Sequence, residues 1–310
     1  MDRGRTVIRV GIDEAGYGPT LGPLVTVTTA WECAPGADPW ELAGRLAAPG
    51  QRAPRIADSK RVFSSRKGLA PLEASAGAVL AARFGRLPAT MAELVQGVTG
   101  KPWTEIFAGA PWFDGADLPL PVAAAGPFGP AQDITAWMTA RIVDAPRFNA
   151  LIASGLNKSD LLFNEVCSML RETAAAFPGR ELQVTVDRLG GRDYYRPVLI
   201  EQLPGWRIAI VEERSSISTY DLQGPEGAMR VSFRVKADAH EFAVAAASLV
   251  AKYLRELTMH LFNRHFAGLK AGLAPTQGYP VDAQRFLTEI GPVVSAADLA
   301  PSGGAPGVDG

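Results

Sequence analysis

The chain has 310 residues and a formal net charge of −1, and its composition is 47% hydrophobic and 20% charged. These values exclude wholesale disorder and a global basic field, so any phosphate-binding surface must be a local patch. The two cysteines, Cys33 and Cys167, lack metal-ligand spacing and predict free thiols in a reducing compartment rather than a disulfide. There is no apolar signal region at the N-terminus and no apolar stretch long enough to span a bilayer. We therefore expect a soluble, cytoplasmic protein without membrane contact.

The N-terminal part of the chain predicts a β-hairpin followed by a loop and a helix. Residues 6–12 alternate as in a strand, and the β-branched residues 24–31 predict its hairpin partner. Residues 35–54 predict a loop with one helical turn, and residues 64–80 predict a helix.

Residues 84–132 form the least regular part of the sequence. They are rich in proline and glycine, contain Trp103, Trp112 and Phe113, and predict one short helix at 91–96. We interpret this stretch as an insertion packed on the main domain, with its aromatic residues forming a core rather than a platform for stacking bases.

The second half of the chain alternates strands and helices. A polar loop containing glycine and proline is expected to join the last two strands. The predicted strands are 134–143, 182–186, 206–211 and 231–235, and the predicted helices are 159–177 and 241–262. This order indicates an α/β fold, a mixed sheet flanked by helices. We expect a catalytic domain at 1–252 that includes the insertion, a C-terminal helical extension at 253–294, and a disordered tail at 295–310.

Two adjacent acids, Asp13 and Glu14, end the first predicted strand within a glycine-rich motif. A polar turn with solvated acids is one interpretation of this motif, and a functional site is the other. A dinucleotide-binding loop is rejected because the glycine spacing is wrong and because acids directly before the turn would repel a pyrophosphate.

Asp187 and Asp238 also follow apolar strands. Each alone is consistent with a turn or helix-capping residue. Several strands that end in carboxylates at one edge of a sheet instead predict a site for a divalent cation, and oxygen ligands suit Mg²⁺ or Mn²⁺. The three histidines have no partners at zinc-ligand spacing.

An ordered set of motifs resembles the type 2 ribonucleases H, the family of bacterial ribonuclease HII. The motifs are Gly11-Ile-Asp13-Glu14-Ala-Gly16-Tyr17-Gly18-Pro19 with Gly22-Pro23, Asp58-Ser59-Lys60, Asn157 before a helix, Val184-Thr-Val-Asp187, Lys236-Ala-Asp238-Ala, Ala245-Ala-Ala-Ser248-Leu-Val-Ala-Lys252 with Arg255, and Gly278-Tyr279-Pro280. The resemblance implies a ribonuclease H-like fold and an endonuclease that acts on RNA–DNA hybrids or on ribonucleotides embedded in duplex DNA.

The resemblance also implies a two-metal mechanism with Asp13, Glu14, Asp187 and Asp238 as catalytic and metal-binding residues. Asp13 would bridge two Mg²⁺ or Mn²⁺ ions. Asp238 would help to hold the ion that activates water, and Glu14 and Asp187 would hold the ion at the leaving 3′-oxygen. The products would end in 5′-phosphate and 3′-hydroxyl.

Eight further residues are expected to bind the nucleic acid. Several of them have structural alternatives, which are solvated charge for the lysines, packing at a helix edge for the tyrosine, and close packing for the serine. They are Gly16, Tyr17, Gly18, Lys60, Asn157, Ser248, Lys252 and Tyr279.

The sequence departs from the family pattern at two positions. Tyr17 stands where the family has the arginine of Gly-Arg-Gly, and Gln284 stands where it has a histidine. A tyrosine cannot supply a guanidinium fork to a phosphate or 2′-hydroxyl. Three hypotheses therefore stay open, which are the usual ribonuclease H, a nuclease with shifted specificity, and a non-catalytic nucleic-acid-binding protein. In each case we expect a monomer.

Overall fold

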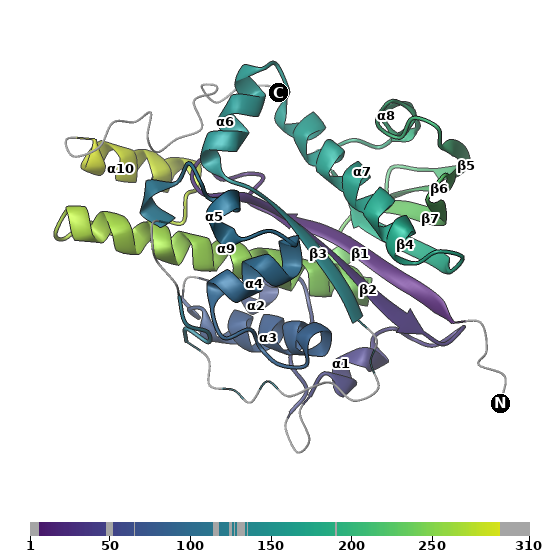
Figure 1. The fold of residues 1–310 in the computed structure, drawn as a ribbon, viewed down its shortest axis with the longest axis horizontal. Coiled ribbons are helices and arrows are strands. Elements are labelled where there is room, and N and C mark those ends of the chain that lie inside the picture. The colour runs from purple at the N-terminus through teal and green to yellow at the C-terminus, as the bar shows by residue number, and fades with distance from the viewer. Residues whose placement is uncertain are drawn as a thin grey trace.

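A seven-stranded mixed sheet runs through the centre of the protein, with strand order β3-β2-β1-β4-β7-β6-β5 (Figure 1). The computed structural model describes residues 6–291 except 48–51, 65, 114–117, 124–125, 127, 129–133, 135 and 190. Strand β4 is parallel to both β1 and β7, and the other neighbouring pairs are antiparallel. The strands are β1 (Val7–Ala15), β2 (Leu24–Cys33), β3 (Ala136–Val143), β4 (Glu181–Asp187), β5 (Arg207–Glu213), β6 (Ile217–Gly224) and β7 (Gly227–Arg234).

Helices cover both faces of the sheet, and a separate apolar core lies under each face. Helices α9, α3 and α4 pack on one face and α7 packs on the other (Figure 1). The helices are α1 (Glu41–Arg45), α2 (Ser59–Val62), α3 (Ala70–Phe84), α4 (Met91–Thr99), α5 (Trp103–Ile106), α6 (Ala145–Ala153), α7 (Lys158–Ala176), α8 (Arg196–Gln202), α9 (Phe242–Leu269) and α10 (Pro280–Ile290), with 3₁₀ turns η1 (Pro111–Phe113) and η2 (Ala237–Ala239). The fold class predicted from the sequence is confirmed.

Helix α9 lies unusually close to β1, and this contact sets the position of the site. A Cβ atom on Gly11 would lie 2.1 Å from the backbone carbon of Ala243, so only glycine fits there. The Thr29 hydroxyl of β2 donates a 2.8 Å hydrogen bond to the Ala243 carbonyl oxygen. The alanine run 245–247 is fully buried, as expected for close helix–sheet packing.

The insertion contributes to the main core. Trp112 and Phe113 are buried, the Phe107 ring stacks on Phe113 at 4.0 Å, and Trp112 meets Phe262 of α9 at 5.5 Å. The expected short helix is present as α4, and α5 and η1 add further turns. Its aromatic residues are therefore core residues, as the sequence indicated.

The structure corrects several predictions. The expected loop between residues 211 and 231 contains β6, whose polar residues alternate with buried Tyr220 and Leu222. Helix α3 begins at Ala70 rather than at 64, and α9 ends at Leu269 rather than at 262. The tail predicted at 295–310 lies outside the described residues.

Both cysteines are free and buried, in agreement with the sequence. Within the described ranges, no helix is long and apolar enough to cross a membrane.

Candidate active site

The four acids lie at the ends of three neighbouring strands. Asp13 and Glu14 are near the end of β1, Asp187 ends β4, and Asp238 is in η2, four residues after the end of β7. Since β1, β4 and β7 run in the same direction side by side, their carboxyl ends meet at one edge of the sheet. We refer to this group of four acids as the acidic edge.

Backbone hydrogen bonds fix two of these acids. Asp13 is 6% exposed and accepts a 2.8 Å hydrogen bond from the Glu14 amide. Asp187 accepts a 2.7 Å hydrogen bond from the Ala237 amide, which ties the end of β4 to η2. Lys236 enters this turn with a φ of 54°, a left-handed conformation that is rare outside glycine. The strained turn brings Asp238 to the edge.

Burial raises the pKa of every carboxyl group at the acidic edge, and the charges of neighbouring acids add to the shift. Burial raises the pKa of Asp13 well above its ordinary value, and the charges of Glu14 and Asp187 raise it further. Burial, followed by the Asp187 charge, raises the pKa of Glu14 to about 7.

The other two acids are shifted in the same direction. Burial raises the pKa of Asp187, and backbone hydrogen bonds oppose the shift. Burial, followed by the Asp58 charge, raises the pKa of Asp238 to about 6. The edge therefore concentrates negative charge with too little positive charge to balance it.

A divalent cation would provide the missing positive charge. Carboxylate oxygens are the donors that Mg²⁺ and Mn²⁺ prefer, so the donor set fits such ions. Among the described residues, however, no three acidic, histidine or cysteine side chains are gathered closely enough to hold a metal ion. The chemistry of the donors thus fits a metal, although their side chains are not gathered around one point.

Lys60 and Ser248 are the predicted binding residues with direct links to the acidic edge. Lys60 is exposed, and its ammonium opposes the rise in the pKa of Glu14, Asp187 and Asp238. The buried Ser248 hydroxyl lies 3.1 Å from the Ser59 hydroxyl, and a hydrogen bond from Ser248 to Asp13 opposes the rise in the pKa of Asp13. Both residues therefore moderate the charge of the edge.

Lys252 and Asn157 make contacts within the protein. Lys252 forms a 2.6 Å ion pair with Glu256, and its ammonium lies 4.8 Å from the centre of the Phe63 ring. Asn157 caps α7 by accepting a 2.8 Å hydrogen bond from the Asp160 amide. Asn157 is exposed, whereas the side chain of Lys252 is 13% exposed.

The remaining predicted residues belong to the opening loop and to the start of α10. Gly16 has a φ of 100°, and Gly18 is exposed with open space around it. The half-buried Tyr17 ring packs against the core on the α7 side of the sheet. Tyr279 is 47% exposed and immediately precedes α10.

Three residues at or near the site had no role assigned from the sequence. Asp58 caps α2 and adds negative charge beside Asp238. Arg192 lies in the loop after β4 and acts electrostatically on Tyr17. Arg255 is buried beneath the opening loop, next to Gly16. Asp58 and Arg255 stood within the quoted motifs, but no pattern indicated Arg192.

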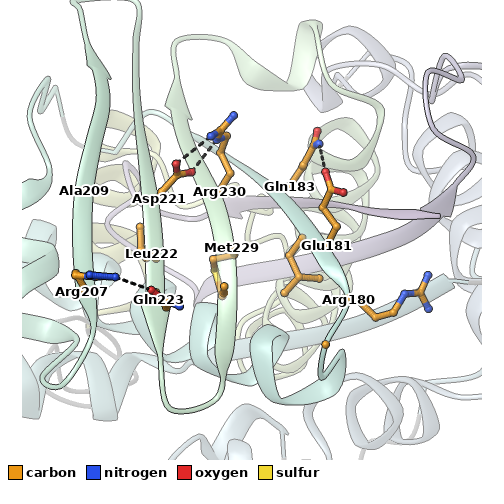
Figure 2. Close-up of a pocket in the computed structure, with 13 residues that line it drawn as sticks. Arg180, Glu181, Gln183, Arg207, Ala209, Asp221, Leu222, Gln223, Met229 and Arg230 are labelled. Carbon is orange, nitrogen blue, oxygen red and sulfur yellow. Dashed lines mark hydrogen bonds and ion pairs between the residues drawn. The ribbon is translucent and has the colours of Figure 1, made fainter. Parts of the chain in front are cut away.

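A cavity of about 650 Å³ lies away from the acidic edge, over β4, β5, β6 and β7 (Figure 2). Its charged side chains are matched. Arg230 forms a two-point ion pair with Asp221, and Arg207 donates to Gln223 at 3.1 Å. We refer to it as the paired cavity.

Comparisons with known proteins agree with this architecture. The chain is similar to the Bst-RNase HIII structure in complex with Mn²⁺, with a TM-score of 0.54, 16% identity, and coverage of 97% of this chain and 68% of that one. A variant of Bst-RNase HIII gives a TM-score of 0.51 at 18% identity, with coverage of 96% and 67%. The ribonuclease H2 from Pyrococcus horikoshii OT3 gives 0.47 at 16% identity, with coverage of 92% and 87%. The first two define a ribonuclease H fold.

The family model described as Ribonuclease HII matches residues 208–289, a segment that includes Asp238 but not the other three acids. No curated protein matches the chain. The chain therefore has a ribonuclease H fold, and its residues 208–289 are similar to the Ribonuclease HII family.

Proposed function

We propose that this protein is a metal-dependent endonuclease that hydrolyses the RNA strand of RNA–DNA hybrids, or ribonucleotides embedded in duplex DNA. The observation that carries the proposal is the acidic edge itself. Burial and the charges of neighbouring acids raise the pKa of its four carboxyl groups, and the positive charge of Lys60 opposes this shift only in part. Such an arrangement is costly unless a cation balances the negative charge.

In this proposal Asp13, Glu14, Asp187 and Asp238 hold two Mg²⁺ or Mn²⁺ ions. The ions would supply charge stabilisation at the attacked phosphate and a more acidic water. Asp13, on β1, would be the ligand shared between them, as the family resemblance implies. The Ala237 amide keeps the Asp187 carboxylate oriented, and Ser248 does the same for Asp13.

The nucleic acid would lie against the exposed groups around the acidic edge. Lys60 would approach a backbone phosphate, because its ammonium is exposed beside the acids. The exposed Tyr279 ring offers a surface for stacking on a sugar or base, and Gly18 allows close approach of the backbone.

A cleavage assay with two substrates tests the proposal. One substrate is a DNA duplex with a single ribonucleotide and the other is a uniform RNA–DNA hybrid, each in Mg²⁺ and in Mn²⁺. We expect metal-dependent cutting that leaves 5′-phosphate, and we expect Asp13→Asn to abolish it while the variant stays folded, since repulsion at the edge is reduced. No metal-dependent cutting of either substrate, or full activity of Asp13→Asn, would contradict the proposal.

A shifted specificity is the second candidate. The observation that favours it concerns Tyr17. Its ring is half-buried against the α7-side core, and it provides no positive charge in the opening loop. In that case the same assay would show cutting of the uniform hybrid without cutting at the single ribonucleotide.

A further inference from the structure

One face of α9 contacts both the opening motif and the segment around α2. Ser248 reaches Asp13 and Ser59, Lys252 lies over Phe63 just after α2, and Arg255 reaches the opening loop. These residues are four and three positions apart, so they follow one side of the helix. The helix therefore holds the segments around the acidic edge in register.

Arg255 joins the opening loop to the segment that precedes Tyr279. Its Nη2 donates a 3.0 Å hydrogen bond to the Leu21 carbonyl oxygen and another of 3.0 Å to the Gln277 carbonyl oxygen. The amides of Thr20 and Leu21 in turn donate to the Gly278 carbonyl oxygen at 2.7 and 3.1 Å. The opening loop and the segment before Tyr279 are thus fastened together directly and through one guanidinium.

Three glycines with positive φ lie around this guanidinium. A Cβ atom on Gly16 or on Gly278 would lie 2.2 or 2.4 Å from a backbone carbonyl oxygen of the opening loop and 3.2 Å from an Arg255 nitrogen, and one on Gly22 would lie 2.5 Å from the Met259 sulfur. Glycine at these positions therefore lets the two segments pack closely beside the arginine.

Burying the Arg255 guanidinium here costs free energy. Its side chain is 1% exposed, and among the described residues Nε and Nη1 have no hydrogen-bond partner. Nη1 has only an ion pair with Glu256 at 3.6 Å. A buried guanidinium with free donors is less favourable than an apolar side chain of similar volume. Its contribution should therefore lie in the two carbonyl groups that it holds.

We propose that Arg255 is a positioning residue for nucleic-acid binding, which sets the opening loop and Tyr279 at a fixed separation beside the acidic edge. This inference rests on the proposed function, because it assigns Gly18 and Tyr279 to substrate contact. Arg255 itself is buried and does not touch the substrate.

The test compares Arg255→Met with Leu257→Ala, a variant that opens a cavity at a fully buried position of the same helix. We expect Arg255→Met to raise the Kd for an RNA–DNA hybrid, measured in Ca²⁺, and the KM for its cleavage by about tenfold, with kcat within about threefold. Leu257→Ala should leave both constants within about twofold even if it lowers Tm more. Arg255→Lys should be intermediate, because an ammonium lacks the planar fork.

Hydrogen exchange separates this inference from the proposed function. Arg255→Met should speed exchange of the Thr20 and Leu21 amides at least about tenfold whether or not the protein cleaves anything. Unchanged exchange, or equal KM increases in Arg255→Met and Leu257→Ala, would overturn the positioning role. Cleavage of neither substrate by the unmodified protein, with faster exchange in Arg255→Met, would contradict the proposed function alone.

Discussion

The same face of strand β4 carries two polar regions with opposite electrostatics. Glu181, Gln183 and Asp187 alternate with buried residues and so share that face. Glu181 and Gln183 line the paired cavity (Figure 2). Asp187 belongs to the acidic edge. The two regions are thus neighbours on one sheet, and both are rich in charge.

The difference lies in how the charges are matched. In the paired cavity, hydrogen bonds from Arg230 lower the pKa of Asp221 below its ordinary value. At the acidic edge, burial and repulsion raise the pKa of each acid. The unbalanced charge of the acidic edge therefore indicates a functional site more clearly than a cavity of about 650 Å³ with paired charges does. In this protein, the pKa shifts of the acids therefore point to a functional site, whereas the size of the cavity does not.

The largest expected effect comes from the same substitution made in both regions. Asp187→Asn keeps the acceptor for the Ala237 amide but removes a charge from the edge, so we expect cleavage to fall by at least about a hundredfold. Asp221→Asn breaks an ion pair whose side chains are half exposed, so activity should stay within about twofold. Initial rates of cleavage in Mg²⁺ measure both.

Two results would break this comparison. If Asp187→Asn retained most of its activity, the acidic edge would not be the catalytic site. If Asp221→Asn lost activity as strongly, with an unchanged Tm, the paired cavity would have to take part in the reaction.

A second, smaller effect concerns pH. The folded protein binds protons on Glu14 and Asp238 more tightly than the unfolded chain, because their pKa values rise from 4.5 to about 7 and from 3.8 to about 6. This contribution to the free energy of unfolding is present below about pH 4 and is lost as pH rises to about 7. Metal-free protein should therefore lose a few degrees of Tm between about pH 5 and about pH 8.

One variant at the acidic edge and one in the paired cavity serve as controls for this pH dependence. Glu14→Gln should weaken the fall in Tm, and Mg²⁺ should reduce it by favouring the ionised acids. Asp221→Asn should leave it almost unchanged, since the pKa of Asp221 is lowered rather than raised. A fall of equal size in Glu14→Gln and in the unmodified protein would assign the pH dependence to other groups.

The sequence predicted the acidic edge well because each acid follows an apolar strand. The ends of β1 and β4 could be predicted from the alternation of each strand and from the carboxylate that follows it. Because the two strands are parallel, their acids lie at the same edge of the sheet. Strand β6 was missed because Ser218, Thr219 and Asp221 give it the composition of a polar loop. Its alternation becomes visible only once Tyr220 and Leu222 are known to be buried.

The contacts between segments could not be predicted from the sequence. Arg255 has the pattern of an ordinary polar position in a helix, and its burial depends on two distant segments that meet around it. Arg192 follows β4 in a loop without any periodic signal, and its approach to Tyr17 depends on the packing of α7. Local pattern specifies elements and their ends, whereas these contacts arise from tertiary packing.

The smallest expected effect concerns Tyr17, which lies on the border of the acidic edge. Tyr17→Arg would bring a positive charge beside Glu14 and a guanidinium fork for a phosphate or 2′-hydroxyl, so the edge would become more like the paired cavity. We expect cleavage at a single ribonucleotide, relative to the uniform hybrid, to rise about threefold to tenfold, measured as the ratio of the two kcat/KM values. Tyr17→Phe keeps the ring against the core and should not change this ratio, and Tyr17→Lys should change it less than arginine because it adds charge without the fork. Equal ratios for all four proteins would mean that specificity is set elsewhere, with Tyr279 the next residue to test.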